Sequence, residues 1–193
     1  MYSNSSNRWS NTHFITLLYG ISTATSFFNN GDGRTGVATI SKYTAEEYFF
    51  QRSRYREPII KTPKVVLLTK YRLENNEQLL IANIHAVNFV TSIELTDQIR
   101  NVVKVIQEHT GPVIFAGDFN TWTRRKQRKM RAILKNIGMN EVSYKDGDHR
   151  LRFMGKILDY LWFRGLKLKS SIVYKEIQGS DHIQMGHEFS TIN

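Results

Sequence analysis

The chain has 193 residues, of which 40% are hydrophobic and 23% charged, a composition that excludes disordered and collagen-like chains and predicts one globular domain. It contains no cysteine, which excludes disulfides, thiolate catalysis and Cys-based zinc or iron–sulfur sites. With 27 Lys and Arg against 17 Asp and Glu, its net charge is +10, and such a field attracts polyanions such as nucleic acid or anionic lipid headgroups.

The N-terminal part, residues 1–21, is a polar, Asn- and Ser-rich leader followed by the apolar run 14–21. Neither this run nor any other is long enough to cross a bilayer, so we expect no transmembrane segment. Behind Arg8 the run has the form of a signal-peptide segment, so export is the alternative to the cytoplasmic location that we expect. No repeat or linker divides the sequence, which predicts a single domain over residues 1–193.

Three β-strands are predicted before the first helix. A turn-forming cluster at residues 29–33 precedes a strand over residues 35–41. Residues 64–71 and 78–85 are rich in β-formers and are separated by a short polar turn, which predicts an antiparallel hairpin. The second strand of this hairpin ends at His85.

A helix and a buried strand are predicted after the hairpin. Thr91 and Glu94 have the spacing of a capping box, and apolar residues follow at helical spacing until Gly111 ends the helix. The wholly apolar run 112–116 predicts a strand that is buried on both faces. Strand, helix and strand together form a crossover unit, which leads into the sequence Gly-Asp-Phe-Asn at residues 117–120.

The C-terminal half predicts a second helix and further strands. Residues 124–136 have apolar side chains on one face and a strongly basic other face, and Gly138 stands where helices often end in left-handed backbone. Residues 157–163 and 167–174 predict two strands, and an alternating segment closes the chain. This mixture of hairpins and crossovers predicts α/β layers.

Polar residues gather at the ends of the predicted strands. They are the carboxylates Asp118, Asp159 and Asp181 and the imidazoles His85 and His182. Because ligands of open α/β sheets bind outside strand ends, we expect these groups to converge on one rim, where they could hold a divalent cation and move protons. Each residue alone has a structural alternative, since a single histidine or aspartate after a strand is often only a turn or cap residue.

The segment Gly117-Asp118-Phe119-Asn120 places a carboxylate and a carboxamide two residues apart. In an extended segment the two side chains would lie on the same side, with the aromatic residue pointing the other way. Asp118 could accept a proton from water or hold it in line, and Asn120 could donate to the oxyanion that develops on phosphorus.

Four motifs together resemble the endonuclease/exonuclease/phosphatase superfamily. They are Asn83-Ile84-His85, Gly117-Asp118-Phe119-Asn120, Leu158-Asp159 and Ser180-Asp181-His182, in the family's order and spacing. The resemblance covers roughly residues 22 to 189, and the longer strings around His85 and Asp118 are most similar to the uncharacterised bacterial YafD-like branch. It implies a deoxyribonuclease-like fold, a four-layer α/β/β/α sandwich, and a metal-assisted attack of water on a phosphoester.

The resemblance also implies the roles of single residues. The implied catalytic residues are His85, Asp118, Asn120, Asp159 and His182. His182 would be the general base or the transition-state stabiliser, oriented by Asp159, and His85 would be the second imidazole at the scissile phosphate. Asp118 would position the nucleophile and Asn120 would contact the phosphate. Such a transition state spreads negative charge over several oxygens, which cations and donors stabilise.

The cofactor that the resemblance implies is Mg²⁺ or Mn²⁺, faced by Asp181 and Asp118. The family's principal metal ligand is a glutamate at the end of an early strand, and no glutamate precedes Glu46 in this chain. We therefore expect an N-terminally incomplete sandwich with weak metal affinity. A missing strand would also leave an exposed sheet edge that favours self-association. The chain is then either part of a longer active protein or a degenerate family member without catalysis.

The basic helix directly follows the phosphate-handling motif. Arg124, Arg125 and Arg128 could contact a phosphate backbone, and Trp122 adds a stacking surface, so we expect a substrate-binding role on nucleic acid or another phosphoester. A solvated helix face is the structural alternative, and anionic lipid headgroups are a third fit.

The expected function is a divalent-metal-dependent phosphodiesterase, most consistent with a nuclease. The alternatives are a family member that binds phosphate-rich polymers without catalysis, or an enzyme acting on lipid or inositol phosphates. A Ser/His/Asp hydrolase is disfavoured because the sequence has no G-x-S-x-G turn.

Overall fold

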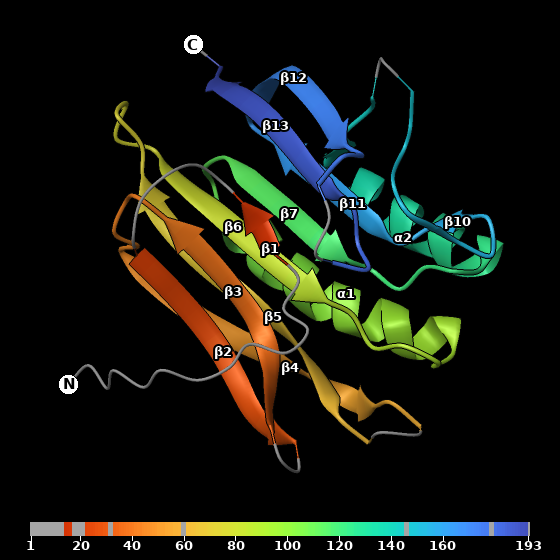
Figure 1. Ribbon diagram of the computed structural model, residues 1–193. Coiled ribbons are helices and arrows are strands. Elements are labelled where there is room, and N and C mark those ends of the chain that lie inside the picture. The colour runs from red at the N-terminus through yellow and green to blue at the C-terminus, as the bar shows by residue number, and fades with distance from the viewer. Residues whose placement is uncertain are drawn as a thin grey trace.

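A six-stranded mixed sheet forms the centre of the molecule (Figure 1). The computed structural model describes residues 14–16, 22–30, 33–58, 61–144, 147–177 and 180–192, with side chains from residue 36 onward. The polar leader and most of the apolar run that follows it lie outside the described residues. In spatial order the sheet contains β4(Glu47–Arg56), β5(Pro63–Arg72), β6(Gln78–His85), β7(Val113–Asp118), β11(Asp159–Arg164) and β8(Asn140–Glu141).

The predicted hairpin and crossover are both confirmed. Strands β5 and β6 pair antiparallel, and β6 pairs parallel with β7. The crossover between β6 and β7 is α1(Ser92–Glu108), and its capping box is formed. Glu94 N donates to Thr91 Oγ1 at 3.3 Å, and Thr91 N donates to Glu94 Oε2 at 2.7 Å.

Helices cover one face of the central sheet and a second layer of strands covers the other (Figure 1). On the first face α1 and α2(Arg124–Asn136) pack over a core that includes Phe115, Tyr160 and Trp162. The second layer contains the sheet β1(Phe14–Thr16), β3(Gly33–Ser41) and β2(Ser22–Asn30), and the hairpin β12(Leu166–Tyr174) with β13(Gln184–Thr191). A short hairpin of β9(Arg152–Phe153) and β10(Lys156–Ile157) precedes β11.

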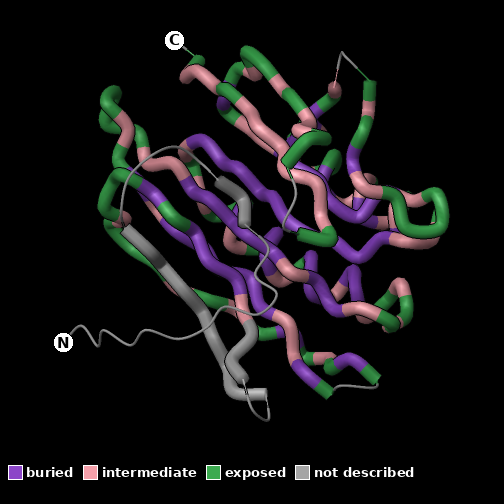
Figure 2. The backbone as a smooth tube through the Cα atoms, viewed as in Figure 1, coloured by how far each residue is buried: buried purple, intermediate pink, exposed green. Residues whose placement is uncertain are grey.

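These layers are the α/β/β part of the expected sandwich. Within the described ranges no helix covers the outer face of the second layer, and the incomplete fourth layer stays a prediction. Figure 2 shows the central strands buried along most of their length. All six residues of β7 are buried, as the wholly apolar run 112–116 predicts for a strand between two layers.

Several elements differ from the sequence prediction, and the strands β1, β2, β8 and β9 were absent from it. Strand β4 was not predicted, because its inward positions include the polar residues Gln51 and Ser53, so its sequence does not alternate between apolar and polar although its burial does. Strand β7 continues past Ala116 to Asp118, since Gly117 permits a close approach to β6. At φ +133° a Cβ on Gly117 would lie 2.0 Å from the Ile84 carbonyl oxygen, so no other residue fits there. The strand predicted over residues 157–163 is β11, which begins at Asp159, because Ile157 belongs to the short strand β10.

Candidate active site at the ends of three central strands

His85, Asp118 and Asp159 form one row across three neighbouring strands. His85 at the end of β6 pairs in register with Asp118 of β7, and Asp118 pairs with Asp159 of β11. Side chains that are laterally paired in a sheet point to the same face. Asn83, two residues before His85, donates its amide to the Ala38 carbonyl of β3 at 2.9 Å, which places this face toward the second layer. The rim expected from the sequence therefore brings these three residues together.

His182 joins the row from the segment just before β13. Its Nδ1 lies 2.7 Å from Asp159 Oδ2, and its backbone N–H donates to Ser180 Oγ at 3.0 Å. The bond to the carboxylate makes Nδ1 the donor and thereby fixes the orientation of the imidazole ring. This is the orienting contact that the family resemblance implied for the two residues.

Asp118 lies between the two imidazoles and is almost completely buried. One carboxylate oxygen, Oδ1, accepts the Asn120 backbone N–H at 2.8 Å, and Oδ2 lies 3.8 Å from His85 Nε2. Burial, together with the nearby charge of Asp159, raises the pKa of Asp118 to about 7, although the Asn120 hydrogen bond, His182 and Lys64 oppose this rise. A carboxyl group with such a pKa exchanges its proton near neutral pH.

The imidazole of His182 is shifted in favour of its charged form. Burial alone would lower its pKa, but the hydrogen bond and charge of Asp159, aided by Asp118 and Asp181, raise the pKa of His182 to about 9. His182 is therefore an imidazolium at neutral pH, which suits stabilisation of negative charge better than proton abstraction. Of the two expected roles for His182, the electrostatics favour transition-state stabiliser over general base.

Asn120 differs from its predicted geometry. Its φ is +48°, so the chain turns left-handed there, and Asp118 and Asn120 do not lie on one side of an extended segment. The turn lets the Asn120 backbone bond to Asp118, and the side-chain Nδ2 donates to the Ala86 carbonyl at 2.8 Å. Asn120 is only 2% exposed and holds the loops after β6 and β7 together. Its contact with a phosphate stays a prediction.

The expected divalent-metal site does not fit the described residues. Asp181 is exposed, whereas Asp118 is buried and bonded to a backbone N–H. Nowhere in the part of the chain that the structure describes do three His, Asp or Glu side chains converge in a way that could hold a metal ion. Hard cations prefer several oxygen ligands. The two buried carboxylates at the site already accept other hydrogen bonds, Asp159 from His182 and Asp118 from the Asn120 backbone N–H.

The basic helix α2 differs in part from its prediction. Arg124, Arg125 and Arg128 are exposed, as expected for residues that contact a polyanion. Two other cations of the helix bind neighbouring side chains instead. Lys126 is buried with its Nζ 4.4 Å from the centre of the Trp122 ring, and Arg131 binds the carboxylate of Glu141. Their partners lie before the helix and after it, so a helical pattern alone places both cations on the solvent face.

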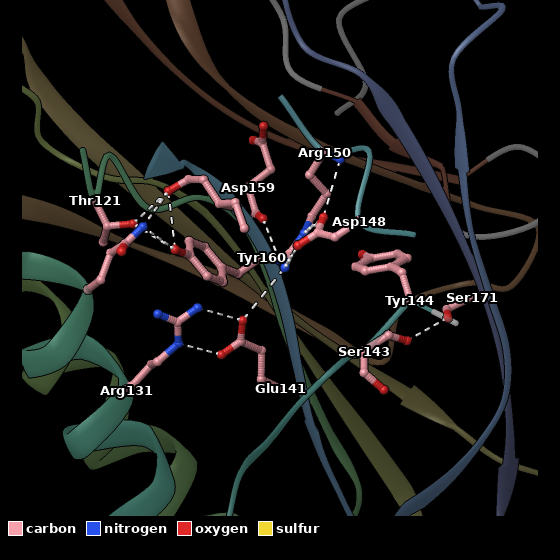
Figure 3. Close-up of polar contacts among 12 residues, drawn as sticks. Thr121, Arg131, Glu141, Ser143, Tyr144, Asp148, Arg150, Asp159, Tyr160 and Ser171 are labelled. Atoms are coloured by element: carbon pink, nitrogen blue, oxygen red, sulfur yellow. Dashed lines mark hydrogen bonds and ion pairs between the residues drawn. The ribbon is translucent and has the colours of Figure 1, made fainter. Parts of the chain in front are cut away.

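Arg150 is a buried arginine that the sequence did not predict, and it binds the backbone of the site residue Asp159 (Figure 3). Arg150 donates from its NH1 group to the Asp159 carbonyl oxygen at 3.1 Å and forms two 2.8 Å bonds with the carboxylate of Asp148. Its guanidinium lies over the rings of Tyr144 and Tyr160, at 4.9 Å and 5.2 Å from their centres. No local pattern marks this residue, because a single arginine in a polar loop is ordinarily exposed.

A second missed feature is the buried pair of Glu57 and Lys64. Their charged groups lie 3.3 Å apart, and the charge of Lys64 lowers the pKa of Asp118 against the effect of burial. Glu57 Oε1 also accepts the Asn88 backbone N–H at 3.2 Å, which anchors the loop after β6.

This fold and arrangement of side chains agree with comparisons to known proteins. A family model described as the Endonuclease/Exonuclease/phosphatase family matches residues 4–182. The chain belongs to this family, as the four motifs predicted. Within it, the chain is similar to curated UPF0294 proteins, which confirms the predicted likeness to the YafD-like branch.

Two of these relatives are longer than the chain. A UPF0294 protein of Vibrio campbellii is 40% identical over 129 residues, covering 66% of this chain and 45% of the relative. A UPF0294 protein of Photorhabdus laumondii is 32% identical over 170 residues, covering 88% of this chain and 64% of the relative. The chain thus spans about half to two thirds of the length of these relatives.

Solved structures confirm the deoxyribonuclease-like fold. The human Nocturnin catalytic domain with bound sulfate anion superposes with a TM-score of 0.63 at 19% identity, covering 88% of this chain and 73% of that chain. An endonuclease/exonuclease/phosphatase family protein from Leptotrichia buccalis gives 0.65 at 19% identity, with 88% and 70% covered. ANGEL2, a 2′,3′-cyclic phosphatase, gives 0.56 at 12% identity, with 76% and 64% covered. No helix in the described residues is long and apolar enough to span a bilayer.

Proposed function

We propose that this domain is a phosphodiesterase of the nuclease type, which hydrolyses phosphodiester bonds in nucleic acid. The observation that carries the proposal is the row of His85, Asp118 and Asp159, completed by His182 at 2.7 Å from Asp159. It places a carboxyl group that exchanges its proton near neutral pH beside a fixed imidazolium. Membership of a family of nucleases and phosphatases supports cleavage of a P–O ester bond.

The chemistry assigned to these residues is hydrolysis by acid and base. Water attacks phosphorus, a new P–O bond forms, and the Asp118 carboxylate accepts the proton that the water loses. The P–O bond to the leaving group breaks, and the leaving oxygen takes a proton from the His182 imidazolium. Asp159 orients His182 throughout, and His85, when protonated, adds a second positive charge beside the phosphoryl oxygens.

Dependence on Mg²⁺ or Mn²⁺ is the part of the proposal that rests on the family alone. A divalent cation would neutralise phosphoryl charge, with Asp118 and Asp181 as the implied ligands. Since the described residues supply no third ligand, we assign no step to a cation. The same observation favours a second candidate function, in which the domain binds phosphate-rich polymers without cleaving them.

The preference for nucleic acid rests on the exposed cations of α2. Arg124, Arg125 and Arg128 follow the loop that carries Asn120, so a polymer with its scissile phosphate at the row could place neighbouring phosphates along the helix. A lipid or inositol phosphate substrate would need no such extended set of cations. Hydrolysis of lipid in micelles that continues in an excess of competitor DNA would support a lipid phosphoesterase and contradict the nuclease assignment.

The assembly and location of the domain are further parts of the proposal. Strand β4 is an edge strand of the central sheet, and its unpaired side is the expected surface for self-association. We propose a cytoplasmic location and one domain over residues 1–193. Light scattering after size-exclusion chromatography measures self-association. Fractionation of cells that express the chain tests the cytoplasmic location.

The deciding experiment measures hydrolysis of bis(p-nitrophenyl) phosphate and of plasmid DNA by the purified chain, with Mg²⁺, with Mn²⁺ and with chelator. His182→Ala is the test variant, and His149→Ala, which removes an exposed histidine from a loop, is the matched control. The proposal expects turnover that falls at least a hundredfold in His182→Ala and is unchanged in His149→Ala. Binding of DNA without turnover under all three conditions would favour the non-catalytic function.

A further inference from the structure

Two aromatic side chains lie together on the loops that follow two of the site strands, and they have no part in the proposed chemistry. Phe89 stands four residues after His85, and Trp122 stands four residues after Asp118, so each belongs to the loop that leaves a site strand. Their ring centres are 6.1 Å apart with planes inclined at 51°. Phe89 is 56% exposed, although burying such a ring would stabilise the fold.

The loops hold this pair in place through Asn88. Its Oδ1 accepts the indole N–H of Trp122 at 2.9 Å and the backbone N–H of Phe89 at 2.8 Å. Its own backbone N–H is bound by Glu57 at 3.2 Å. Phe89 has a left-handed φ of +53°, which costs a residue with a Cβ about 1 kcal/mol or more and persists only where neighbours enforce it.

Helix packing does not explain the exposed ring. The residue directly before the N-cap of α1 is the one that commonly packs against the first turn, and here that residue is Val90, which packs against the main core. Phe89 stands one position earlier and points away from the core. Its exposure and its enforced backbone are therefore not by-products of starting α1.

The indole ring is fixed on one face as well as at its edge. Lys126 is buried with its ammonium 4.4 Å from the ring centre, and within the described residues this ammonium has no hydrogen-bond partner. The ring stabilises the ammonium by a cation–π contact, and the charge of Glu94 adds to this. Trp122 is thus a rigid surface, and rigid aromatic side chains lose little entropy when they bind a flat ligand.

Positive charge lies next to the pair. Arg124 and Arg125 occupy the first turn of α2, where the helix dipole disfavours cations, and no acidic residue is present there to compensate. Arg128 lies one turn further on and is also exposed. A bound anion would offset this concentration of charge, so aromatic rings and anion-seeking cations adjoin one another at the proposed site.

We propose that Phe89 and Trp122 form a platform that stacks an unpaired nucleobase next to the scissile phosphate. This assignment rests on the proposed function for the bond that is cleaved, and it specifies single-stranded nucleic acid or a frayed end as the substrate. Stacked bases in a duplex cannot reach such a platform, whereas single strands offer a free ring and a phosphate chain together. An anionic membrane surface would also attract aromatic rings and arginines. Binding to a membrane, however, does not require an indole ring that is fixed by a hydrogen bond at its N–H and by a lysine on one face, as Trp122 is.

The test measures equilibrium binding in the His182→Ala background, in which the proposed turnover is suppressed; the parent in this test is the chain with that change alone. A fluorescently labelled 12-nucleotide oligo-dT, the same strand carrying abasic sites at its centre, and a blunt duplex are titrated with the chain, and anisotropy is recorded. We expect the parent to bind oligo-dT at least fivefold more tightly than the abasic strand, because stacking supplies sequence-tolerant affinity. We also expect Phe89→Ala and Phe89→Leu to bind both strands equally.

The matched control is Phe50→Ala, which removes a phenylalanine that is 50% exposed on the edge strand β4. It should leave the preference for oligo-dT over the abasic strand unchanged. Equal binding of the two strands by the parent, or an intact preference in both Phe89 variants, would overturn the platform. The platform would also be overturned if Phe89→Ala lost binding to vesicles that contain phosphatidylserine but bound oligonucleotides as the parent does.

The platform and the proposed function fail separately in this design. Base-dependent binding that requires Phe89, with no hydrolysis in the turnover assay, would support the platform and reject the phosphodiesterase. Hydrolysis that requires His182, with no preference for strands that carry bases, would do the opposite.

Discussion

The carboxylate of Asp159 lies 2.7 Å from His182 Nδ1, and Asp159 is also the register partner of Asp118 in the neighbouring strand. One carboxylate therefore acts on two titrating groups. Its charge raises the pKa of Asp118, and its hydrogen bond raises the pKa of His182. The result is an interval of pH, between about 7 and about 9, in which Asp118 is a carboxylate while His182 is an imidazolium.

The first prediction is a bell-shaped pH profile for kcat/KM. The rate should rise as Asp118 loses its proton near pH 7 and fall as His182 loses its proton near pH 9. In Asp159→Asn both limbs should move to lower pH, because the charge that raises both pKa values is gone. NMR titration of the His182 ring reports the same upper pKa without turnover. An unchanged His182 titration in Asp159→Asn would contradict the assignment.

The second prediction concerns the stability cost of Asp118. Its pKa is raised from 3.8 to about 7 in the folded state, so the folded protein keeps a proton that the unfolded chain releases. Stability therefore declines between pH 4 and pH 7, and Asp118→Asn should remove that decline. We expect Asp118→Asn to be more stable than the parent by on the order of 2 kcal/mol at pH 8 and nearly equal at pH 4.

Urea unfolding at the two pH values measures this effect, with Asp97→Asn on α1 as the control. The control should shift the free energy of unfolding by a few tenths of a kcal/mol at both pH values. A variant Asp118→Asn that is destabilised at pH 8 would show that the buried carboxylate stabilises the fold as a charge.

Local patterns carried most of the sequence prediction of the fold. The hairpin of β5 and β6, the capping box of Thr91 and the buried strand β7 all depend on neighbouring residues, so their sequences predict them directly. The row of His85, Asp118 and Asp159 was predictable as well, because it follows from where β6 and β7 end and where β11 begins.

The features that sequence reasoning missed depend on contacts between distant segments. The left-handed turn at Asn120 is held by the Ala86 carbonyl, 34 residues away. Lys126 and Arg131 turn inward to Trp122 and Glu141, although a lysine or arginine in a helix is ordinarily exposed. Strand β4 has the polar residues Gln51 and Ser53 at inward positions, so its sequence lacks the apolar–polar alternation by which strands are recognised.

The third prediction tests the arginine behind the site. Arg150 is buried and binds Asp148 and the Asp159 carbonyl (Figure 3). Replacing it with Met leaves the carboxylate of Asp148 without its main partner and the Asp159 carbonyl without this donor, so the free energy of unfolding should fall by about 3 kcal/mol. The control is Arg152→Met, whose parent side chain is 47% exposed and which should cost less than about 1 kcal/mol. Equal losses in the two variants would mean that burial of Arg150 contributes nothing.

The fourth prediction concerns the residue that lets β6 and β7 approach each other. In Gly117→Ala the new Cβ would lie 2.0 Å from the Ile84 carbonyl oxygen, at a φ of +133° that residues with a Cβ avoid. Backbone must move to relieve that contact, and Asp118 is the next residue in the strand, so we expect a loss of about 3 kcal/mol or more in stability and a larger proportional loss of activity. Gly155→Ala is the control, because Gly155 has a φ of +74° and no atom within 4 Å of the added Cβ, so only about 1 kcal/mol should be lost. Circular dichroism and denaturant unfolding compare the two variants. If Gly117→Ala were no less stable than Gly155→Ala, the close approach of the strands would not be what requires glycine beside Asp118.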